Sequence, residues 1–407
     1  MRILFVHQNA PGQYVHLKRW ATNTDGVTPV AITEHGNQRA DTIPTIRYKM
    51  PTLTSGQTSS AVKRFGDSIA RAEAAAKAAI AYRNKGFSPD VIFGHGAWGE
   101  TFYLKEVFPD AKVICYAEFY YRSKGQNIGF DPEFDQQSPD TIRTVSTQNA
   151  TMTTSLLASD IGQVPTDYQA NTFPKELRQK LTIAFDGIDT QTIIPDSQAS
   201  ISLQDGTVLR AGDPVITFVN RNFEPYRGYH TFMRALPKIL KNNPNAHVIM
   251  VGGDGVSYGQ PPLGDTSWKS IFLDEVVDRL DMSRVHFTGQ VSTRVLRQIY
   301  QVSAVHVYLT YPFVLSWSML EAMSAGCLVI GSDVAPVREM ICDNESGLLT
   351  DFFDHELLAQ RVLEVLENSG RYVHVRRAAR DHVVKHYDLT TVCLPNQIAL
   401  IQRVLAI

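Results

Sequence analysis

The segment Val305–Asp333 combines residue types that suit a bound diphosphate. An apolar strand ends near Tyr311, and a helix is predicted to begin around Ser318 with Glu321 in its first turn. Free backbone N–H groups at a helix start favour anions, and Ser316 and Ser318 can cap that start. A carboxylate at this place can accept both hydroxyls of a ribose. The segment is therefore a candidate nucleotide site, although a plain strand–helix–strand unit with a dipole-compensating glutamate would show the same pattern.

Two arginines stand at the carboxyl end of another predicted strand, Val215–Asn220. Arg221 and Arg227 are six residues apart, and Gly228 precedes a predicted helix. Guanidinium groups can neutralise a leaving diphosphate because they keep their charge and carry forked donors. The alternative is that both arginines lie on the surface and one of them pairs with Glu224.

Glycines follow two further predicted strands. Gly253 lies in the Gly-rich turn 251–255, and Gly12 follows the first strand of the chain. Glycine lets the backbone come close to a ligand. Gly-rich turns are also common in α/β proteins without such a role, so this pattern is only weakly specific.

The elements that must position these residues alternate between short apolar runs and longer amphipathic ones. We expect strands at Ile3–His7, Val27–Thr33, Asp90–Gly94, Lys112–Ala117, Leu181–Phe185, Val215–Asn220, His247–Gly252, Val285–Gly289, Val305–Leu309 and Leu328–Gly331. We expect helices at Gln13–Ala21, Ser60–Lys85, Tyr229–Lys241, Ser267–Leu280, Thr293–Val302, Ser318–Ala325 and Val392–Ile407. This alternation predicts doubly wound parallel sheets with ligands at the carboxyl ends of the strands.

The length of 407 residues is too great for one ordinary core and fits two domains. We place an N-terminal domain at 1–190, a polar linker with a hairpin at 191–213, and a second domain at 214–390. The hairpin is indicated by Asp205-Gly206, because this pair favours a tight turn. The final helix, within 391–407, is a candidate to pack back on the N-terminal domain.

Composition excludes several classes of protein. The chain is 43% hydrophobic and 20% charged, which is ordinary for a globular protein, and its net charge of -2 gives no reason to expect nucleic-acid binding. The N-terminal apolar run is too short for a signal peptide, and no stretch approaches the ~20 apolar residues of a membrane span. We expect a cytoplasmic protein with reduced cysteines. The cysteines lie far apart and form no metal-ligand pair: Cys115, Cys327, Cys342 and Cys393.

One predicted helix, Ser60–Lys85, is rich in Lys and Arg. Such a helix suggests weak peripheral contact with the inner face of a membrane. Its alanine-rich stretch carries no large apolar face, which favours a solvated helix instead.

Together these features resemble the family 4 retaining glycosyltransferases of the GT-B fold, over nearly the whole chain and most densely over 215–350. The matching positions are Arg221, Arg227 and Gly228; Gly252, Gly253 and Gly255; Val285, Phe287 and Gly289; Asp186, Gly187, Ile188 and Asp189; and Gly12. The resemblance implies two Rossmann-like domains facing a cleft, with the acceptor in the first domain and the nucleotide sugar in the second.

The chain departs from the family at one important position. The family motif has two glutamates separated by seven residues, of which Glu321 matches the second, the one that holds the ribose. The first, which usually meets hydroxyls of the donor sugar, falls on Phe313, and phenylalanine cannot accept those bonds. The residues between them, 314–317, are replaced as well. We interpret this as the character of a subgroup in which sugar recognition differs.

Two residues of the first domain stand where the family often has acceptor-side groups. His95 follows a strand, at a position where family members often carry a histidine. Glu118 is the nearest equivalent of a His-Asp pair found in many members. A structural histidine is the alternative at His95, whereas a carboxylate among aromatic residues is costly to bury without a purpose.

The resemblance implies a retaining glycosyltransferase that moves a hexose-type sugar from UDP or GDP to a glycan, lipid-linked or small-molecule acceptor, in cell-surface polysaccharide or glycoconjugate synthesis. It implies same-face attack without a metal or other cofactor. The expected catalytic residues are Arg221, Arg227, Glu118 and His95. The expected nucleotide-sugar-binding residues are Gly12, Arg221, Arg227, Gly253, Val291, Ser316, Trp317, Ser318 and Glu321.

Two alternatives remain open. Phe313 would suit a non-catalytic, glycosyltransferase-like binding subunit, whereas Arg221, Arg227 and Glu321 oppose that reading. A GT-B nucleotide-sugar epimerase would need carboxylates around the sugar ring, which Phe313 does not supply.

Overall fold

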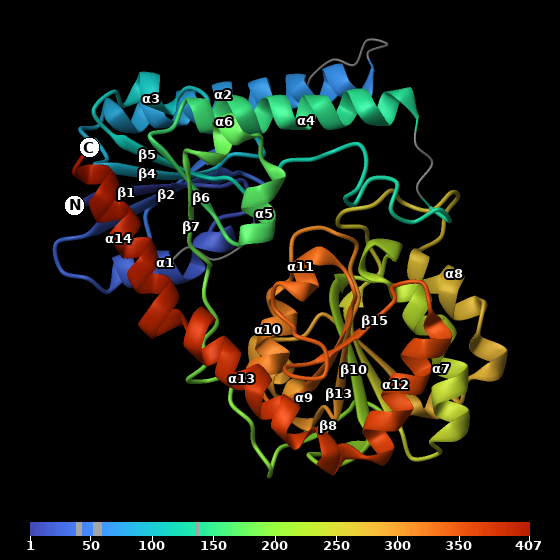
Figure 1. The fold of residues 1–407 in the computed structure, drawn as a ribbon. Helices are drawn as coiled ribbons and strands as arrows, with labels where there is room; N and C mark the ends of the chain where they lie inside the picture. Colours follow the sequence, from blue (N-terminus) through green and yellow to red (C-terminus); the bar gives the residue numbers. More distant parts are fainter. Residues whose placement is uncertain (38–42, 52–58, 135–137) are drawn as a thin grey trace. The chain divides into compact units, whose positions relative to one another are not determined.

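The computed structural model describes residues 1–37, 43–51, 59–134 and 138–407, and its internal contacts divide the chain into two units. The first unit comprises Met1–Gly187 together with Leu389–Ile407, and the second comprises Ile188–Asp388. Figure 1 shows a parallel sheet between helices in each unit. The doubly wound α/β architecture predicted from the strand–helix alternation is confirmed.

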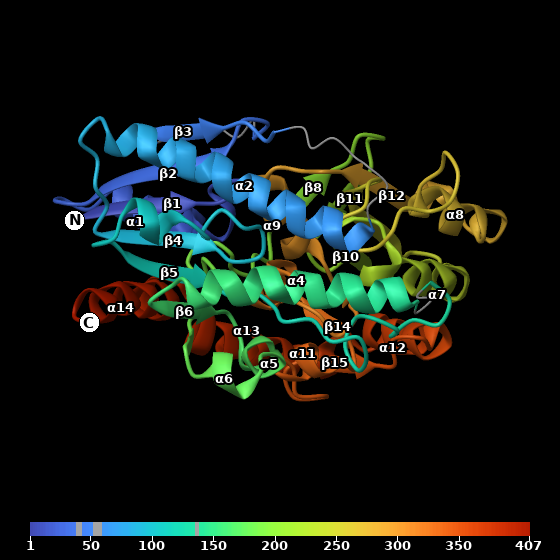
Figure 2. The ribbon, with the colours of Figure 1, turned by 90° about the horizontal axis from the view of Figure 1, so that it is seen from above.

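The first unit is built on a parallel sheet with strand order β3-β2-β1-β4-β5-β6-β7. Its strands are β1 (Arg2–Val6), β2 (Thr28–Glu34), β3 (Thr45–Tyr48), β4 (Val91–His95), β5 (Lys112–Tyr116), β6 (Ile161–Val164) and β7 (Leu181–Ile183). Its helices are α1 (Val15–Thr22), α2 (Ser60–Arg83), α3 (Leu104–Val107), α4 (Pro139–Leu157), α5 (Asp167–Thr172), α6 (Lys175–Arg178) and α14 (Leu394–Leu405). The long helices α2 and α4 run side by side along one face of the sheet (Figure 2).

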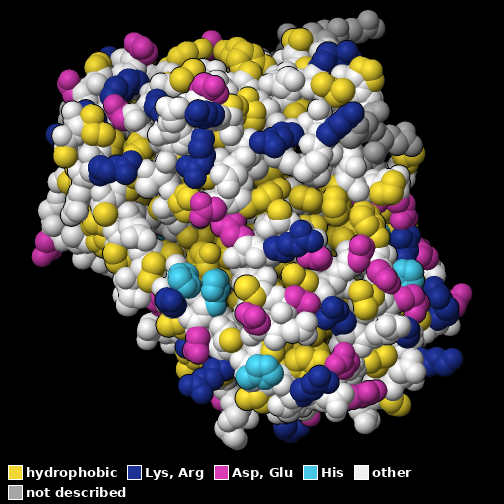
Figure 3. Space-filling view, in the orientation of Figure 1, with side chains coloured by type: hydrophobic (Ala, Val, Ile, Leu, Met, Phe, Trp, Pro, Cys, Tyr) yellow, Lys and Arg dark blue, Asp and Glu magenta, His cyan; other side chains and the backbone are white. Residues whose placement is uncertain are grey.

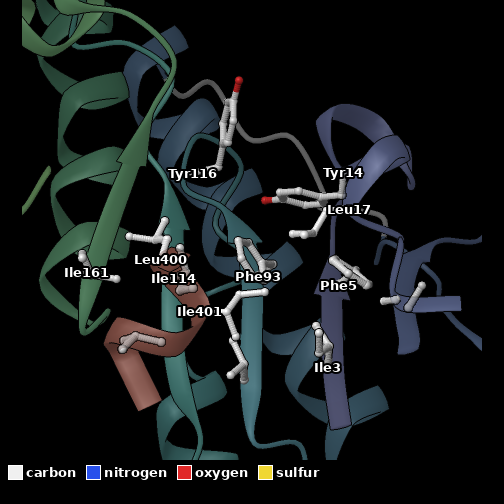
Figure 4. Close-up of a cluster of buried hydrophobic side chains, with 14 of the residues drawn as sticks. Ile3, Phe5, Tyr14, Leu17, Phe93, Ile114, Tyr116, Ile161, Leu400 and Ile401 are labelled. Atoms are coloured by element: carbon white, nitrogen blue, oxygen red, sulfur yellow. The ribbon is translucent and has the colours of Figure 1, made fainter. Parts of the chain in front are cut away.

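The core of the first unit follows from the alternation of side chains along each strand. In β1, Leu4 and Val6 face the cluster that contains the alanines of α2. Ile3 and Phe5 face the opposite cluster, which contains Leu17 of α1. Leu400 and Ile401 of α14 complete this second cluster (Figure 4). The last helix of the chain therefore belongs to the core of the first unit.

The second unit is built on a parallel sheet with strand order β12-β11-β10-β13-β14-β15. Its strands are β10 (Val215–Asn222), β11 (His247–Gly253), β12 (Val285–Gly289), β13 (Val305–Tyr308), β14 (Leu328–Ser332) and β15 (Leu348–Thr350). Its helices are α7 (Tyr229–Asn242), α8 (Trp268–Asp274), α9 (Thr293–Val302), α10 (Trp317–Ser324), α11 (Ala335–Arg338), α12 (His355–Glu367) and α13 (Val373–Tyr387). In Figure 1, α7 and α12 cover one face of this sheet, and α9, α10 and α13 cover the other.

The stretch expected to be a linker, 191–213, belongs to the second unit. It contains the antiparallel hairpin of β8 (Ser200–Ser202) and β9 (Val208–Arg210), closed by the predicted Asp205-Gly206 turn. The hairpin packs on α9. Residues 191–213 are therefore a packed part of the second unit and not a separate linker.

Several predicted helices have different bounds in the structure, α8 and α10 among them. The expected helix Ser267–Leu280 is shorter: α8 ends at Asp274, and a 3-10 turn follows at Val277–Arg279. Helix α10 begins at Trp317, one residue before the prediction, so Glu321 lies beyond the first turn. The prediction of a first-turn glutamate was therefore wrong.

Charges of both signs are interspersed over the face seen in Figure 3, in keeping with the net charge of -2. Among the described residues, none of the helices has the length and apolar character needed to cross a lipid bilayer. Cys115, Cys327 and Cys393 are buried, and Cys342 is exposed, all as free thiols.

Candidate functional site

The central feature of the second unit is the carboxyl edge of β10 and β13. These strands are neighbours in the sheet, and the chain leaves them toward opposite faces, into α7 and α10 (Figure 1). Arg227 lies in the turn after β10, and Thr310 lies just after β13. The Nη1 of Arg227 donates a hydrogen bond to Thr310 Oγ1 over 2.7 Å. The strand order therefore places Arg227 at a topological switch point, where ligands bind in open α/β sheets.

Arg227 is a buried cation with neutral neighbours. Its side chain is 4% exposed, and its Cζ lies 4.9 Å from the centre of the Tyr258 ring. Within the described parts of the chain, Arg227 makes no ion pair with a carboxylate. A guanidinium does not lose its proton in proteins, and a buried charge without a counter-ion is costly. This environment suits an anion supplied from outside the protein.

Arg221 differs from Arg227. It lies near the end of β10, its side chain is exposed, and it makes no ion pair with any residue that the structure describes. The alternative in which one arginine pairs with Glu224 is wrong, because Glu224 is buried and accepts backbone N–H groups of residues 257–259.

The start of α10 is built from hydroxyl groups. Ser316 is the N-cap, and its Oγ accepts the backbone N–H of Ser318 at 3.3 Å. The hydroxyl of Ser318 also donates to Ser316 Oγ at 3.0 Å, and Ser318 itself is buried. The backbone N–H of Ser316 donates to the phenol oxygen of Tyr308 at 2.8 Å. Trp317, the first residue of the helix, is partly buried. Tyr308 also interacts electrostatically with Arg227, so the start of α10 and the guanidinium lie near each other.

Glu321 projects from α10 toward α9. The phenol of Tyr300 donates to Glu321 Oε2 at 3.5 Å. Burial raises the pKa of Glu321 to about 7, and the hydrogen bond from Tyr300 opposes that shift. Such a carboxyl gains favourable interactions when hydroxyl donors approach it.

Phe313 belongs to an aromatic cluster. It is 3% exposed, and its ring centre lies 5.2 Å from Tyr226 and 5.3 Å from Tyr258. Tyr226 also lies 4.7 Å from Tyr311. At this position the chain thus presents packed rings and no carboxylate.

The two other predicted positions of the second unit lie at neighbouring strand ends. Gly253 ends β11, and a Cβ added there would lie 2.7 Å from Asn222 Oδ1. The contact with Asn222 is therefore enough to explain why this position is a glycine, without a bound ligand. Val291 is partly buried in the short connection between β12 and α9.

In the first unit, Gly12 lies in the connection after β1. Its φ of +52° falls in the left-handed region, and an added Cβ would lie 2.8 Å from the imidazole of His7. His7 Nδ1 accepts the backbone N–H of Asn9 at 2.8 Å, so its Nε2 carries the proton in the neutral ring. Only glycine fits this close approach.

His95 and Glu118 lie near each other at the carboxyl ends of β4 and β5. His95 is 1% exposed, and its Nδ1 accepts the backbone N–H of Ala97 at 3.2 Å. Its Nε2 lies 3.8 Å from Glu118 Oε2, and Gln13 Nε2 donates to Glu118 Oε1 at 3.1 Å. Glu118 is 23% exposed, so it is less buried than the aromatic surroundings suggested.

Several polar residues near these sites were not predicted as catalytic or binding residues. In the first unit, the phenol of Tyr116 lies 3.1 Å from both carboxylate oxygens of buried Asp186. In the second unit they are Glu224, Tyr258 and Thr310. The polar stretch after Gly255 contained a signal for Tyr258, since it is a long connection with a tyrosine beside a glycine.

Comparisons with known proteins agree with this architecture. Residues 25–193 match the model of the glycosyl transferase family 4 group, and residues 203–382 match the model of glycosyl transferases group 1. A phosphatidyl-myo-inositol mannosyltransferase of Mycolicibacterium smegmatis is 27% identical over 205 residues, which is 49% of this chain and 48% of that protein. A D-inositol 3-phosphate glycosyltransferase of Mycobacteroides abscessus is 25% identical over 50% of this chain and 42% of that protein. The matches thus span about half the length of these relatives.

Solved structures show the same fold over nearly the full length. Sucrose-phosphate synthase from Thermosynechococcus elongatus has a TM-score of 0.75 at 19% identity, covering 100% of this chain and 99% of that one. Anabaena HepE in complex with UDP and glucose has a TM-score of 0.67 at 16% identity, covering 99% of each chain. The fold is GT-B, and the two halves of the chain each match a glycosyltransferase family model, that of the family 4 group and that of group 1.

Proposed function

We propose that the protein is a retaining glycosyltransferase that moves a hexose-type sugar from a UDP- or GDP-sugar to a glycan, lipid-linked or small-molecule acceptor. The observation that carries the proposal is Arg227, a buried guanidinium with no carboxylate partner among the described residues, at the switch point between β10 and β13. A diphosphate supplies the missing negative charge. The ribose of the donor would meet Glu321, and the base would lie near Val291.

Arg227 would act on the charge that develops during transfer. The bond between the anomeric carbon and the phosphate oxygen breaks, and its electron pair goes to the departing diphosphate. The acceptor oxygen bonds to the same face of the sugar, and its hydroxyl proton passes to the departing phosphate oxygen. A fixed positive charge at the diphosphate stabilises this transition state more than the ground state. The N–H groups at the start of α10, with Ser316, Trp317 and Ser318, would bind the same group. Exposed Arg221 would add long-range attraction for the donor. In this proposal the reaction needs no metal.

The first unit would supply the acceptor side through His95 and Glu118. A neutral imidazole whose Nε2 carries the proton can donate to a sugar hydroxyl, and Glu118 can accept from one. Gly12, in the connection after β1, would let the backbone approach the donor. The relatives named above act on inositol-containing acceptors, which supports a polyhydroxylated acceptor here. Lysines and arginines of α2 would allow weak contact with a cytoplasmic membrane face.

A ligand screen tests the proposal. Thermal unfolding is measured with UDP-, GDP- and ADP-sugars, and donors that stabilise the protein are then tested for transfer and for slow hydrolysis. Stabilisation by one nucleotide class together with release of its diphosphate supports the glycosyltransferase. Binding without transfer or hydrolysis would favour the non-catalytic subunit, and stabilisation by none of the donors would overturn the proposal.

A further inference from the structure

Glu224 is a completely buried carboxylate between the two candidate arginines in sequence. It accepts the backbone N–H of Tyr258 at 3.1 Å and that of Gly259 at 3.0 Å through Oε2, and the N–H of Ser257 at 3.2 Å through Oε1. In the described residues it forms no ion pair. Its negative charge is therefore held by backbone donors of one short loop.

This loop is attached a second time to the same segment. Asn222 Nδ2 donates to Ser257 Oγ at 2.8 Å. Hydrogen bonds to an ionised acceptor are roughly twice as strong as neutral ones, and three of them converge on Glu224. The residues that precede Arg227 thus fix the backbone of 257–259, which is distant in sequence.

Fixing this backbone also fixes the ring of Tyr258. That ring lies against the guanidinium of Arg227, 4.9 Å from its Cζ, and 5.3 Å from the ring of Phe313. Thr310 accepts a hydrogen bond from Nη1 of the same guanidinium. The guanidinium is therefore held between Thr310 and Tyr258, and one of these two supports depends on Glu224.

We propose that Glu224 is a positioning residue that orients Arg227 through Tyr258. By binding the N–H groups of residues 257–259, it places the tyrosine ring on the guanidinium and sets the direction in which Arg227 presents its remaining donors to the departing phosphate. The effect on transfer rests on the proposed function of Arg227. The fixing of the loop does not.

The first test replaces the carboxylate by its neutral isostere, Glu224→Gln. The amide can keep one acceptor but turns its NH2 toward backbone donors, so exchange of the amide protons of 257–259 should quicken by about tenfold or more. Turnover should fall by about tenfold or more with little change in the KM of the donor, because the lost interaction belongs to the transition state. Glu224→Asp, which keeps the charge, should restore part of the amide protection of 257–259 and part of the turnover. Glu275→Gln, which removes a surface carboxylate paired with Arg234, is the matched control.

The second test keeps Glu224 and changes the tyrosine. Tyr258→Phe retains the ring against Arg227 but loses the hydroxyl, and Tyr258→Ala loses both. Because the contact with Arg227 is made by the ring, we expect Tyr258→Phe to keep turnover close to that of the parent and Tyr258→Ala to lower it. Amide exchange at Ser257 should be unchanged in the Phe variant, because the Glu224 contacts remain. If Glu224→Gln does not fold, the comparison of Glu224→Asp with the parent tests the carboxylate, and this series tests the ring.

The outcomes separate the two proposals. If the unmodified protein neither binds nor transfers from UDP- or GDP-sugars, the proposed function fails, and the catalytic role of Glu224 fails with it. If the unmodified protein transfers sugar while Glu224→Gln and Tyr258→Ala both keep the parent rate, only the positioning role is overturned. Faster amide exchange of residues 257–259 in Glu224→Gln, together with an unchanged rate of sugar transfer, would overturn the positioning role as well.

Discussion

Arg227 donates to Thr310 across 2.7 Å and thereby joins the connection after β10 to the one after β13. The two residues are 83 positions apart, and the parallel pairing of β10 with β13 brings them to one edge of the sheet. Because Thr310 offers a neutral oxygen, this hydrogen bond orients the guanidinium without neutralising it. The arrangement keeps the positive charge in place, which the proposed binding of a diphosphate requires.

The first prediction follows from that unneutralised charge. In Arg227→Met, turnover should fall by about 100-fold or more, since a fixed stabilising group for the transition state is lost. The free energy of unfolding should stay within about 1 kcal/mol of the parent or rise, because removing a buried charge offsets the lost hydrogen bond to Thr310. Denaturant unfolding and steady-state kinetics measure the two quantities. A loss of stability above about 3 kcal/mol would mean that the fold itself needs the charge.

Glu321 gives a prediction about pH. Burial raises its pKa from the ordinary 4.5 to about 7, with the Tyr300 hydrogen bond opposing. The folded state therefore keeps its proton to higher pH than the unfolded chain does. The stabilising contribution is fully present below about pH 4.5 and is lost as the pH rises through about 7. The variant Glu321→Gln should gain stability relative to the parent across this window and show no further relative gain above it.

The same carboxyl should make nucleotide affinity depend on pH. Ribose hydroxyls donate to the ionised form, so affinity for UDP or GDP should rise as the pH passes through about 7. Glu321→Gln should bind more weakly and without that rise. Titration calorimetry in buffers of different protonation enthalpy would detect the released proton. Equal pH dependence in the parent and the variant would exclude Glu321 as the titrating group, and Glu275→Gln controls for the loss of a carboxylate.

Much of the fold could be predicted because buried parallel strands read as apolar runs. The predicted strand Val285–Gly289 and the predicted helix Thr293–Val302 match β12 and α9 at both ends. Helix α4, in contrast, was missed. It spans Pro139–Leu157 and is rich in Thr and Ser, which are weak helix formers. Packing against α2, rather than intrinsic propensity, stabilises it.

The candidate site was only partly predictable, because burial and partners depend on the fold. The sequence shows Arg221 and Arg227 as similar residues, yet one is exposed and the other is 4% exposed. Their difference arises because Arg227 lies in the turn between β10 and α7, against the ring of Tyr258. The role of Glu224 depends on a loop that follows β11, and no local pattern connects the two.

Gly12 allows a comparison within the first unit. Gly12→Ala places a side chain at φ +52° with its Cβ 2.8 Å from His7, whereas Gly26→Ala has φ +77° and no atom within 4 Å. Gly26→Ala should lower the free energy of unfolding by about 1–2 kcal/mol, because of the left-handed backbone alone. Gly12→Ala should lower it by about a further 1–3 kcal/mol, because the added side chain is also overpacked against His7. Equal losses in denaturant unfolding would show that His7 moves away freely.

The last helix provides a prediction about how the first unit is completed. Leu400 is 3% exposed and packs in the cluster that contains Ile114 and Ile161, as Figure 4 shows, whereas Leu405 on the same helix is 42% exposed. Leu400→Ala should lower stability by about 2–5 kcal/mol, and Leu405→Ala should change it by no more than about 0.5 kcal/mol. Hydrogen exchange should locate the loss: amide protons of β1 and β5 should exchange faster, while those of β10 and β13 should not. If Leu400→Ala left β1 and β5 as protected as in the parent, α14 would be dispensable for the first core. That result would contradict the packing seen around Ile114.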